Sequence, residues 1–279
     1  MDNFYLRIDT EVLKKFSPEV QTFLNKENSK NSSKKLKTTF FIRMCPYCDR
    51  LYLLWTPSLI KNDPKYCVLC GETTPIFKIR LSIEKAYALF KISSQFSSIN
   101  KSEEDKRNQR ILIEQCIVIL ATGIELFFKE MYIVGMDLKY VKNNETLFKK
   151  FYKDAKNEFI NMGKINQKFD EDLHLNLKLI FGEDLFKELN ILMLKRNVIV
   201  HNNGFADKTF KENSGIKCEL SRPIPLSIRE TKRNFKMVNT IVEKFQLEYG
   251  KLIAPDFINK IEYKLKQKVS KKQKLFWLC

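Results

Sequence analysis

The sequence is poor in the residues that turns and flexible chains require: it holds 8 glycines and 8 prolines among 279 residues. This scarcity argues against a disordered chain and against an all-β fold built from many turns. Hydrophobic residues make up 44% of the sequence and aromatic residues 12%, so the chain can bury a core. Its length accommodates one large domain or two smaller ones.

Long uncharged apolar runs are also missing. The most apolar stretch, residues 111–134, never reaches the roughly 18 uncharged residues of a membrane-spanning helix, because polar and charged side chains interrupt it (Glu114, Gln115, Glu125, Lys129 and Glu130). The start, Met1-Asp2-Asn3, lacks the basic and then apolar segments of a secretory signal. We therefore expect a soluble, cytoplasmic protein without membrane association, with residues 111–134 as a core helix.

Acidic residues are too few to balance the basic ones. The chain has 33 acidic against 50 basic side chains, a formal net charge of +17 and a pI of about 9.4. Such a charge favours a polyanionic partner, and nucleic acid is the usual one. A lysine-rich proteome would produce the same excess. Arginine is scarce beside lysine, which favours neutralisation of phosphates over bidentate reading of bases.

Four of the 7 cysteines form two CxxC pairs. Cys45 and Cys48 are followed, after 18 residues, by Cys67 and Cys70. This spacing is typical of a four-cysteine zinc ribbon, because each CxxC turn directs two thiolates at one ion. With four protein thiolates the Zn²⁺ site would be closed, so we expect a structural ion and no catalytic metal. Gly71 after the second pair would ease the turn.

The alternatives for these cysteines are a redox CxxC and structural disulfides. A redox CxxC usually occurs singly at a strand–helix junction, and disulfides are rare in a reducing cytoplasm. Residues 40–42, 51–55 and 76–79 are expected to supply strands, with Pro57 ending the second. Basic side chains nearby would touch phosphates or remain solvated (Arg43, Arg50, Lys61 and Lys65). Cys116 is expected in the helical core, whereas Cys218 and Cys279 show no pairing pattern.

The rest of the sequence predicts a mainly α fold, a helical bundle preceded by a small β zinc ribbon. Residues 1–38 hold a helix over about 10–25 and a linker, residues 39–80 the ribbon, residues 81–253 the bundle and residues 254–279 a basic tail. Helices are expected at about 82–96, 104–134, 140–162, 183–202 and 227–252. Acidic residues after Gly182 and a capping box from Ser227 to Glu230 mark two helix starts. Apolar residues then recur with a seven-residue period and form a bundle seam (Ile228, Phe235, Val242 and Tyr249, with Val238, Phe245 and Leu252).

The tail carries lysines at helical spacing (Lys260, Lys264, Lys268, Lys271 and Lys272). They would lie along RNA or form a solvated face. The apolar residues 275–278 are expected to pack on the body of the protein or on a second subunit.

Histidine is nearly absent, and one of the 2 histidines stands in a distinctive context. Arg196, Asn197 and His201 lie at the end of an apolar helical stretch and precede Asn202-Asn203-Gly204. An arginine and a histidine can together hold a phosphate and move a proton without a metal, which indicates RNA cleavage. The alternative is a solvated arginine near a helix C-terminus, with the following residues as a left-handed cap. His174 has no partner motif and is interpreted as structural.

The Arg196-Asn197-x-x-x-His201 sequence resembles the Arg-x4–6-His motif of the HEPN superfamily, over a helical region of about 81–253. The resemblance implies a metal-independent endoribonuclease that acts as a homodimer, with two Arg/His pairs in one cleft. It implies that Arg196 stabilises the phosphate, that His201 moves a proton and that Asn197 orients His201 or the phosphate. It also implies products with 2′,3′-cyclic phosphate ends. Glu125, on the early core helix, would hold Arg196, or would be an ordinary surface carboxylate. The zinc ribbon is no general feature of that superfamily.

The helix geometry agrees with a dimeric site. Arg196 and His201 point about 140° apart around one helix, so a single helix cannot easily direct both at one phosphate, whereas a two-fold axis brings in a second copy. Members of the superfamily often serve as toxins or abortive-infection effectors in antiviral defence. A ribonuclease in that role would harm its own cell unless restrained, so an inhibitor or sensor protein is a further expected partner. Two other functions remain open: a catalytically inactive HEPN-like module that binds RNA or protein, and a nucleic-acid-binding regulator that reads through its zinc ribbon.

Overall fold

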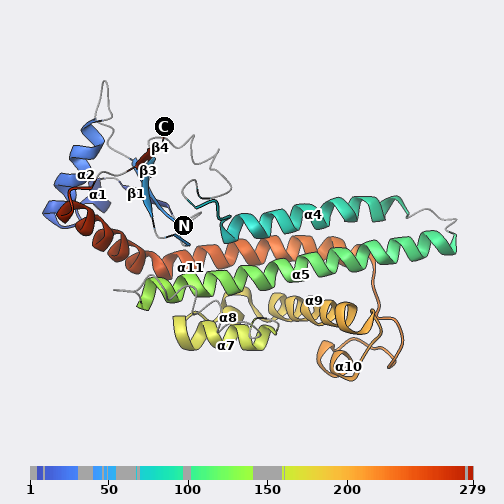
Figure 1. The fold of residues 1–279 in the computed structure, drawn as a ribbon. Coiled ribbons are helices and arrows are strands. Elements are labelled where there is room, and N and C mark those ends of the chain that lie inside the picture. The colour runs from blue at the N-terminus through green and yellow to red at the C-terminus, as the bar shows by residue number, and fades with distance from the viewer. Residues whose placement is uncertain are drawn as a thin grey trace. The chain divides into compact units, whose positions relative to one another are not determined.

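The structure is a computed structural model, and it describes residues 5–8, 10–30, 40–45, 47–48, 50–54, 67, 70–96, 102–140, 159, 161–273 and 276–278. The protein is mainly helical, as predicted (Figure 1). It divides into two compact units. Unit 1 comprises Met1–Thr74, Val134–Lys150 and Tyr249–Cys279, and unit 2 comprises Pro75–Ile133 and Phe151–Glu248.

Unit 1 contains a four-stranded sheet in the order β1-β2-β3-β4. The strands are β1 (Tyr5–Ile8), β2 (Phe40–Met44), β3 (Leu51–Leu54) and β4 (Phe276–Leu278). The first three strands are antiparallel neighbours, and β4 pairs with β3 in parallel, with Leu53 opposite Trp277. The two strands predicted to flank the first CxxC pair are therefore present. The apolar C-terminal residues join the sheet of their own chain, one of their two expected positions.

The helices of unit 1 are α1 (Thr10–Leu13), α2 (Pro18–Lys30), the end of α5 (Glu103–Tyr140) from Val134 onward, and the second part of α11 (Ile228–Ser270) from Tyr249 onward. The helix expected over 10–25 is broken before Pro18, because proline fits the start of a helix and not its interior. Residues 26–30, expected in a linker, continue α2, whereas most of that linker lies outside the described residues. The Ser17 backbone N–H donates to Glu262 at 3.0 Å, which ties α2 to α11.

The predicted tail is helical as far as Ser270 and is not uniformly solvated. α11 passes through Pro255 and continues to Ser270, well beyond the expected end at 252. The reason is an apolar stripe that recurs every four residues and is fully buried from Ile253 onward (Ile253, Phe257, Ile261 and Leu265). Lys260 was expected on a basic face. It is instead buried against this stripe and forms an ion pair with Asp137 of α5.

Unit 2 is built from α4 (Pro75–Gln95), α5 as far as Ile133, α7 (Met162–Leu173), α8 (Leu177–Phe181), α9 (Glu183–Asn202), α10 (Lys208–Ser214) and the first part of α11. The strand expected at 76–79 is wrong, because Pro75 opens α4 at the first helical position and Ile76 and Ile79 begin its buried face. The helix expected over 140–162 falls almost entirely outside the described residues.

Sequence-encoded caps set several of these boundaries. α9 begins at Glu183 as expected, with Glu183 and Asp184 in its first turn. α11 begins at Ile228, where the Ser227 hydroxyl accepts the Glu230 backbone N–H at 3.1 Å, one half of the predicted capping box. The long α5 begins after Ser102, whose hydroxyl accepts the Asp105 N–H at 3.0 Å.

Aromatic side chains fill the centre of unit 2. Phe127 and Phe128 of α5 both meet Phe245 of α11 with ring centroids 5.3 Å apart, and Phe169 of α7 meets Phe245 at 5.5 Å. Such edge-to-face pairs add to the free energy of burial. The predicted seam of α11 is buried from Phe235 to Tyr249, whereas Leu252 is 36% exposed. Gly123 lets α5 approach α4, since a Cβ there would lie 2.6 Å from the Cβ of Ser82.

The apolar stretch in α5 forms the core helix that the sequence predicts, with its Cys116 fully buried. By length and composition alone, the segment Glu103–Lys139 is also apolar enough to cross a membrane. Half of its most apolar window is buried inside the protein.

Candidate functional site

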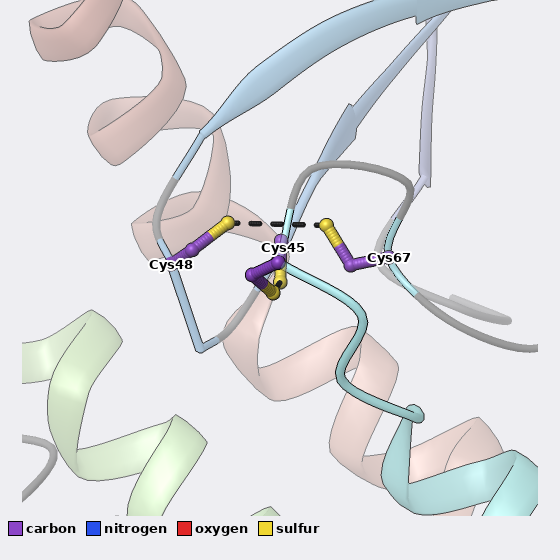
Figure 2. A group of neighbouring side chains, drawn as sticks. Cys45, Cys48 and Cys67 are labelled. Carbon is purple, nitrogen blue, oxygen red and sulfur yellow. Dashed lines mark hydrogen bonds between the residues drawn. The ribbon is translucent and has the colours of Figure 1, made fainter.

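The structure brings the four predicted cysteines together in unit 1. Their sulfur atoms all lie within 4.8 Å of one another. The Cys45 and Cys70 sulfurs are 3.7 Å apart, and those of Cys48 and Cys67 are 3.8 Å apart. Figure 2 shows the Cys48 and Cys67 sulfurs pointing toward each other beside Cys45. The four side chains thus converge on one point.

Two tight turns position these side chains. Cys45 follows β2, and its backbone N–H donates to the Arg50 carbonyl at 3.1 Å, which closes the first turn before β3. In the second turn the Gly71 N–H donates to the Cys67 carbonyl and the Cys67 N–H to the Glu72 carbonyl, both at 2.7 Å. Gly71 adopts φ +77°, the left-handed conformation for which glycine was expected there.

The close packing of these thiols perturbs the pKa values of Cys45, Cys48 and Cys70. Hydrogen bonding from Cys45 lowers the pKa of Cys48 to about 5, even though burial opposes the shift. The same pairing, together with burial, raises the pKa of the Cys45 thiol well above its usual range. Burial raises the pKa of Cys70 to about 11. A bound cation stabilises coordinating sulfurs in the thiolate form, so an ion at this point would favour deprotonation of the cluster.

The donor set fits a metal ion. Tetrahedral coordination at about 2.3 Å per sulfur places neighbouring sulfurs roughly 3.8 Å apart, which matches the distances of 3.7 and 3.8 Å in the cluster. The cluster can therefore hold a metal ion. Arg43, expected to be solvated or to touch phosphate, is 1% exposed and lies within the fold. Arg50 is exposed, whereas Lys61 and Lys65 lie outside the described residues.

A second group of predicted residues meets in unit 2, between α5 and α9. The Arg196 Nη2 atom donates to Glu125 Oε2 at 2.6 Å, and Nη1 donates to Asn197 Oδ1 at 2.9 Å. The Arg196 and Glu125 side chains are 15% and 19% exposed. Arg196 is therefore a partly buried, ion-paired residue, and neither side chain is the solvated surface group of the alternative interpretation.

The Arg196–Glu125 pair is electrostatically tuned. Burial raises the pKa of Glu125, while the charges of Arg196 and then Lys129 pull it back down. Arg196 also keeps its Nε buried without a hydrogen-bond partner. A guanidinium has five N–H donors in one plane, so the contacts to Glu125 and Asn197 leave part of this group unengaged by described residues.

His201 is placed differently from Arg196. It is the penultimate residue of α9 and is exposed, and no hydrogen bond joins its imidazole to any residue in the described part of the chain. Asn197, one turn earlier on the same face, contacts Arg196 instead. Asn203 and Gly204 take the left-handed conformation at φ +49° and +77°, as a cap of α9 should. His174 ends α7 in the same conformation and is also exposed.

The surroundings of the α9 end contain contacts that sequence reasoning missed. Arg110 of α5 pairs with Glu114 at 2.9 Å and donates from Nη1 to the Ile224 carbonyl at 3.2 Å. Lys195, 1% exposed, donates to Glu230 at 2.6 Å and to the Pro225 carbonyl at 2.9 Å. The contacts to Ile224, Pro225 and Glu230 join residues 30 to 114 positions apart, so no local sequence pattern predicts them.

No protein-family model, curated protein or solved structure matches this chain.

Proposed function

We propose that the chain is a metal-independent endoribonuclease of the HEPN type, which cleaves RNA and leaves 2′,3′-cyclic phosphate ends. The observation that carries the proposal is the end of α9. There a partly buried Arg196, oriented by Glu125 and Asn197, lies five residues before the exposed His201. The resemblance of this motif to that superfamily supplies the reaction, and its suggested role in antiviral defence or as a toxin.

Arg196 would stabilise the charge that develops on the phosphate. Glu125 and Asn197 fix the plane of the guanidinium through two of its donors, leaving others for phosphate oxygens. A pre-oriented cation in a partly dehydrated site stabilises a dianionic transition state more than a solvated one does. Glu125 is therefore proposed as a positioning residue.

His201 would move the protons. The ribose 2′-oxygen attacks the adjacent phosphorus as its proton passes to a base, the new O2′–P bond forms, and the P–O5′ bond breaks as O5′ takes up a proton. An imidazole titrates near neutral pH and can serve either transfer. Exposure of His201 at the helix end leaves it accessible to a chain as large as RNA.

A second copy of the chain would complete the site. Because Arg196 and His201 point about 140° apart around α9, the proposal is a homodimer in which the arginine of one copy and the histidine of the other face one phosphate. Exposed apolar side chains flank His201: Val200 is 49% exposed and Phe205 is 44% exposed. They supply apolar surface for such a contact.

We further propose that the ion held by the cysteine cluster is Zn²⁺ and that it is structural. Zinc prefers tetrahedral thiolate sites, and four protein ligands leave no open position for a substrate. The sulfur–sulfur distances of 3.7 and 3.8 Å support this assignment.

The experiment compares wild-type protein with His201→Ala, Arg196→Ala and His174→Ala on total RNA, with the new ends mapped chemically. His174 is a matched control, because it is the other histidine and is also exposed at a helix end. We expect cyclic-phosphate ends from wild type and His174→Ala only. The reaction contains EDTA in excess of Mg²⁺, and the zinc content is measured before and after, so that loss of the cluster's ion is not mistaken for loss of a catalytic metal.

The rival function is a non-catalytic module that binds RNA or protein. The observation that favours it is that Arg196 already has two protein partners while His201 has none among the described residues. A folded, zinc-loaded dimer that binds RNA but leaves it intact, with His201→Ala binding equally well, would support the module and contradict the enzyme.

A further inference from the structure

We propose that Arg110 and Glu114, on α5, are positioning residues that hold His201 in place through the turn that follows it. The inference rests on the proposed ribonuclease function. It starts from a problem in the geometry: His201 is exposed and lacks a hydrogen-bond partner among the described residues, so its position must come from its backbone. A reacting group displaced by about 1 Å can lose a hundredfold in rate.

The turn after His201 is fixed by a short segment that we call the strap, residues 222–225. The Ile224 N–H donates to the Gly204 carbonyl at 2.9 Å, and the Ala206 N–H donates to the Arg222 carbonyl at 2.8 Å. Phe205 and Pro223 form an isolated antiparallel bridge between these bonds. The strap is therefore hydrogen-bonded to the turn at residues 204–206, which begins three residues after His201.

Arg110 and Glu114 anchor both the strap and the turn to α5. Arg110 donates to the Ile224 carbonyl at 3.2 Å, so the residue that bonds Gly204 also receives a bond from α5. Glu114, held by Arg110 at 2.9 Å, lies directly against Gly204, where an added Cβ would be 2.9 Å from Glu114 Oε1. Burial raises the pKa of Glu114, and the Arg110 charge opposes that rise.

The other side of the α9 end is fixed by packing. Leu194 and Val198 belong to a small buried cluster with Ala206, Phe210 and Ile224, so the last turns of α9 and the strap share one core. The backbone of His201 is thus held from before by this cluster and from after by the strap. Arg110 is the polar group that connects the strap to the long helix.

The first test is Arg110→Gln, with Arg107→Gln as the matched control. Arg107 lies one turn earlier on α5, is exposed and loses the same charge. We expect Arg110→Gln to lower kcat on RNA roughly ten- to hundredfold, with KM changed no more than in Arg107→Gln. Equal kcat values in the two variants would overturn the proposal.

A spectroscopic readout separates positioning from general destabilisation and from the cleavage hypothesis itself. With 2 histidines in the chain, the imidazole signals in an NMR spectrum are assigned by His201→Ala and His174→Ala. We expect Arg110→Gln to shift or broaden the His201 signal and to leave that of His174 unchanged. Unchanged signals, or equal changes in both, would overturn the proposal. A wild-type protein that cleaves no RNA would remove the proposed function, yet this selective shift would still show the positioning.

If Arg110→Gln fails to fold, Glu114→Gln takes its place, because it keeps the shape and a hydrogen-bond acceptor and removes only the charge that pairs with Arg110. The same selective change in the His201 signal is expected, with a smaller loss of kcat. A His201 signal identical to that of wild type would overturn the proposal in this variant too.

Discussion

The cysteine cluster of unit 1 and the Arg196–His201 end of unit 2 are opposite kinds of site. In the cluster, all four side chains point at one another, with sulfurs 3.7 and 3.8 Å apart across two pairs. At the end of α9, Arg196 is held by two neighbours whereas His201 faces outward. An ion would engage every side chain of the cluster, whereas the end of α9 keeps hydrogen-bonding groups of Arg196 and His201 without a partner among the described residues.

The difference teaches how to distinguish a site that stabilises from a site that acts. A closed set of four thiolates leaves no coordination position for a substrate, and the free energy of metal binding stabilises the folded state. A partly engaged arginine and an exposed imidazole contribute less to stability than they would if fully paired, and such groups are common where a protein meets a ligand. Three perturbations would break or sharpen this contrast.

The largest effect is expected from the cluster. Cys48→Ser should abolish binding of one metal ion per chain and unfold the sheet of unit 1, because on the order of 10 kcal/mol of binding free energy is coupled to folding in structural zinc sites. Metal content and circular dichroism, measured on the same sample, check this. Cys218→Ser is the control, since Cys218 is partly buried outside the cluster, and it should cost about 1 kcal/mol or less. A Cys48→Ser protein that folds normally without metal would contradict a stabilising role for the cluster.

A smaller effect is expected when Arg196 is removed. Arg196→Ala should lower the free energy of unfolding by roughly 1–3 kcal/mol near neutral pH, because Glu125 keeps its burial and loses its main counter-charge. The pKa of Glu125 is already raised by burial and should rise further. An acid whose pKa is higher in the folded state binds its proton more tightly there. The loss of stability should therefore be smallest at acid pH and grow as pH rises through and above about 4 to 5.

The double variant Arg196→Ala/Glu125→Gln separates stability from activity at this site. Without the carboxylate, the pH-dependent part of the loss should disappear in urea unfolding at acid and neutral pH, while RNA cleavage stays absent. Recovery of cleavage would mean that Arg196 acts only on the fold. Arg233→Ala is the control. It removes the ion pair between Arg233 and Glu188, which is 3.6 Å long and partly exposed, and it should change the free energy of unfolding by less than about 1 kcal/mol.

The smallest effect should distinguish two glycines of similar conformation. Gly204 and Gly215 both follow helices with positive φ, +77° and +66°. A Cβ at Gly215 meets nothing within 4 Å, whereas one at Gly204 meets Glu114. Gly215→Ala should therefore cost about 1 kcal/mol of backbone strain, and Gly204→Ala roughly 1 kcal/mol more, with a lower kcat. Equal losses of stability in thermal unfolding would mean that the Glu114 side chain moves aside at no measurable cost.

The parts of the molecule that the sequence predicts well are those determined by near neighbours. The two CxxC pairs, the Ser227 cap and the acidic start of α9 are local patterns with a direct physical reading. The run Ile76–Ile79 shows the limit, since a short segment with three apolar residues fits a strand or a buried helix equally. Pro75 favours the helix, because proline fits the first helical position, and α4 begins at this residue.

The other misses share one cause, which is contact between positions that are distant in the sequence. Nothing near Lys260 predicts burial against Asp137, and nothing near Arg110 predicts a bond to a carbonyl 114 residues later. The same holds for β1 and β4, which flank the two expected strands of the sheet from opposite ends of the chain. The Arg196–Glu125 contact was anticipated through a family motif, without a spacing rule that would locate Glu125.

The parallel pairing of β4 with β3 sets an order of events during synthesis. Cys70 leaves the ribosome 206 residues before Phe276, the first residue of β4. At about 5–20 residues per second this interval lasts roughly 10 to 40 s. All four thiols are therefore available to hold an ion before β4 has been synthesised, and β4 is the last strand to join the sheet.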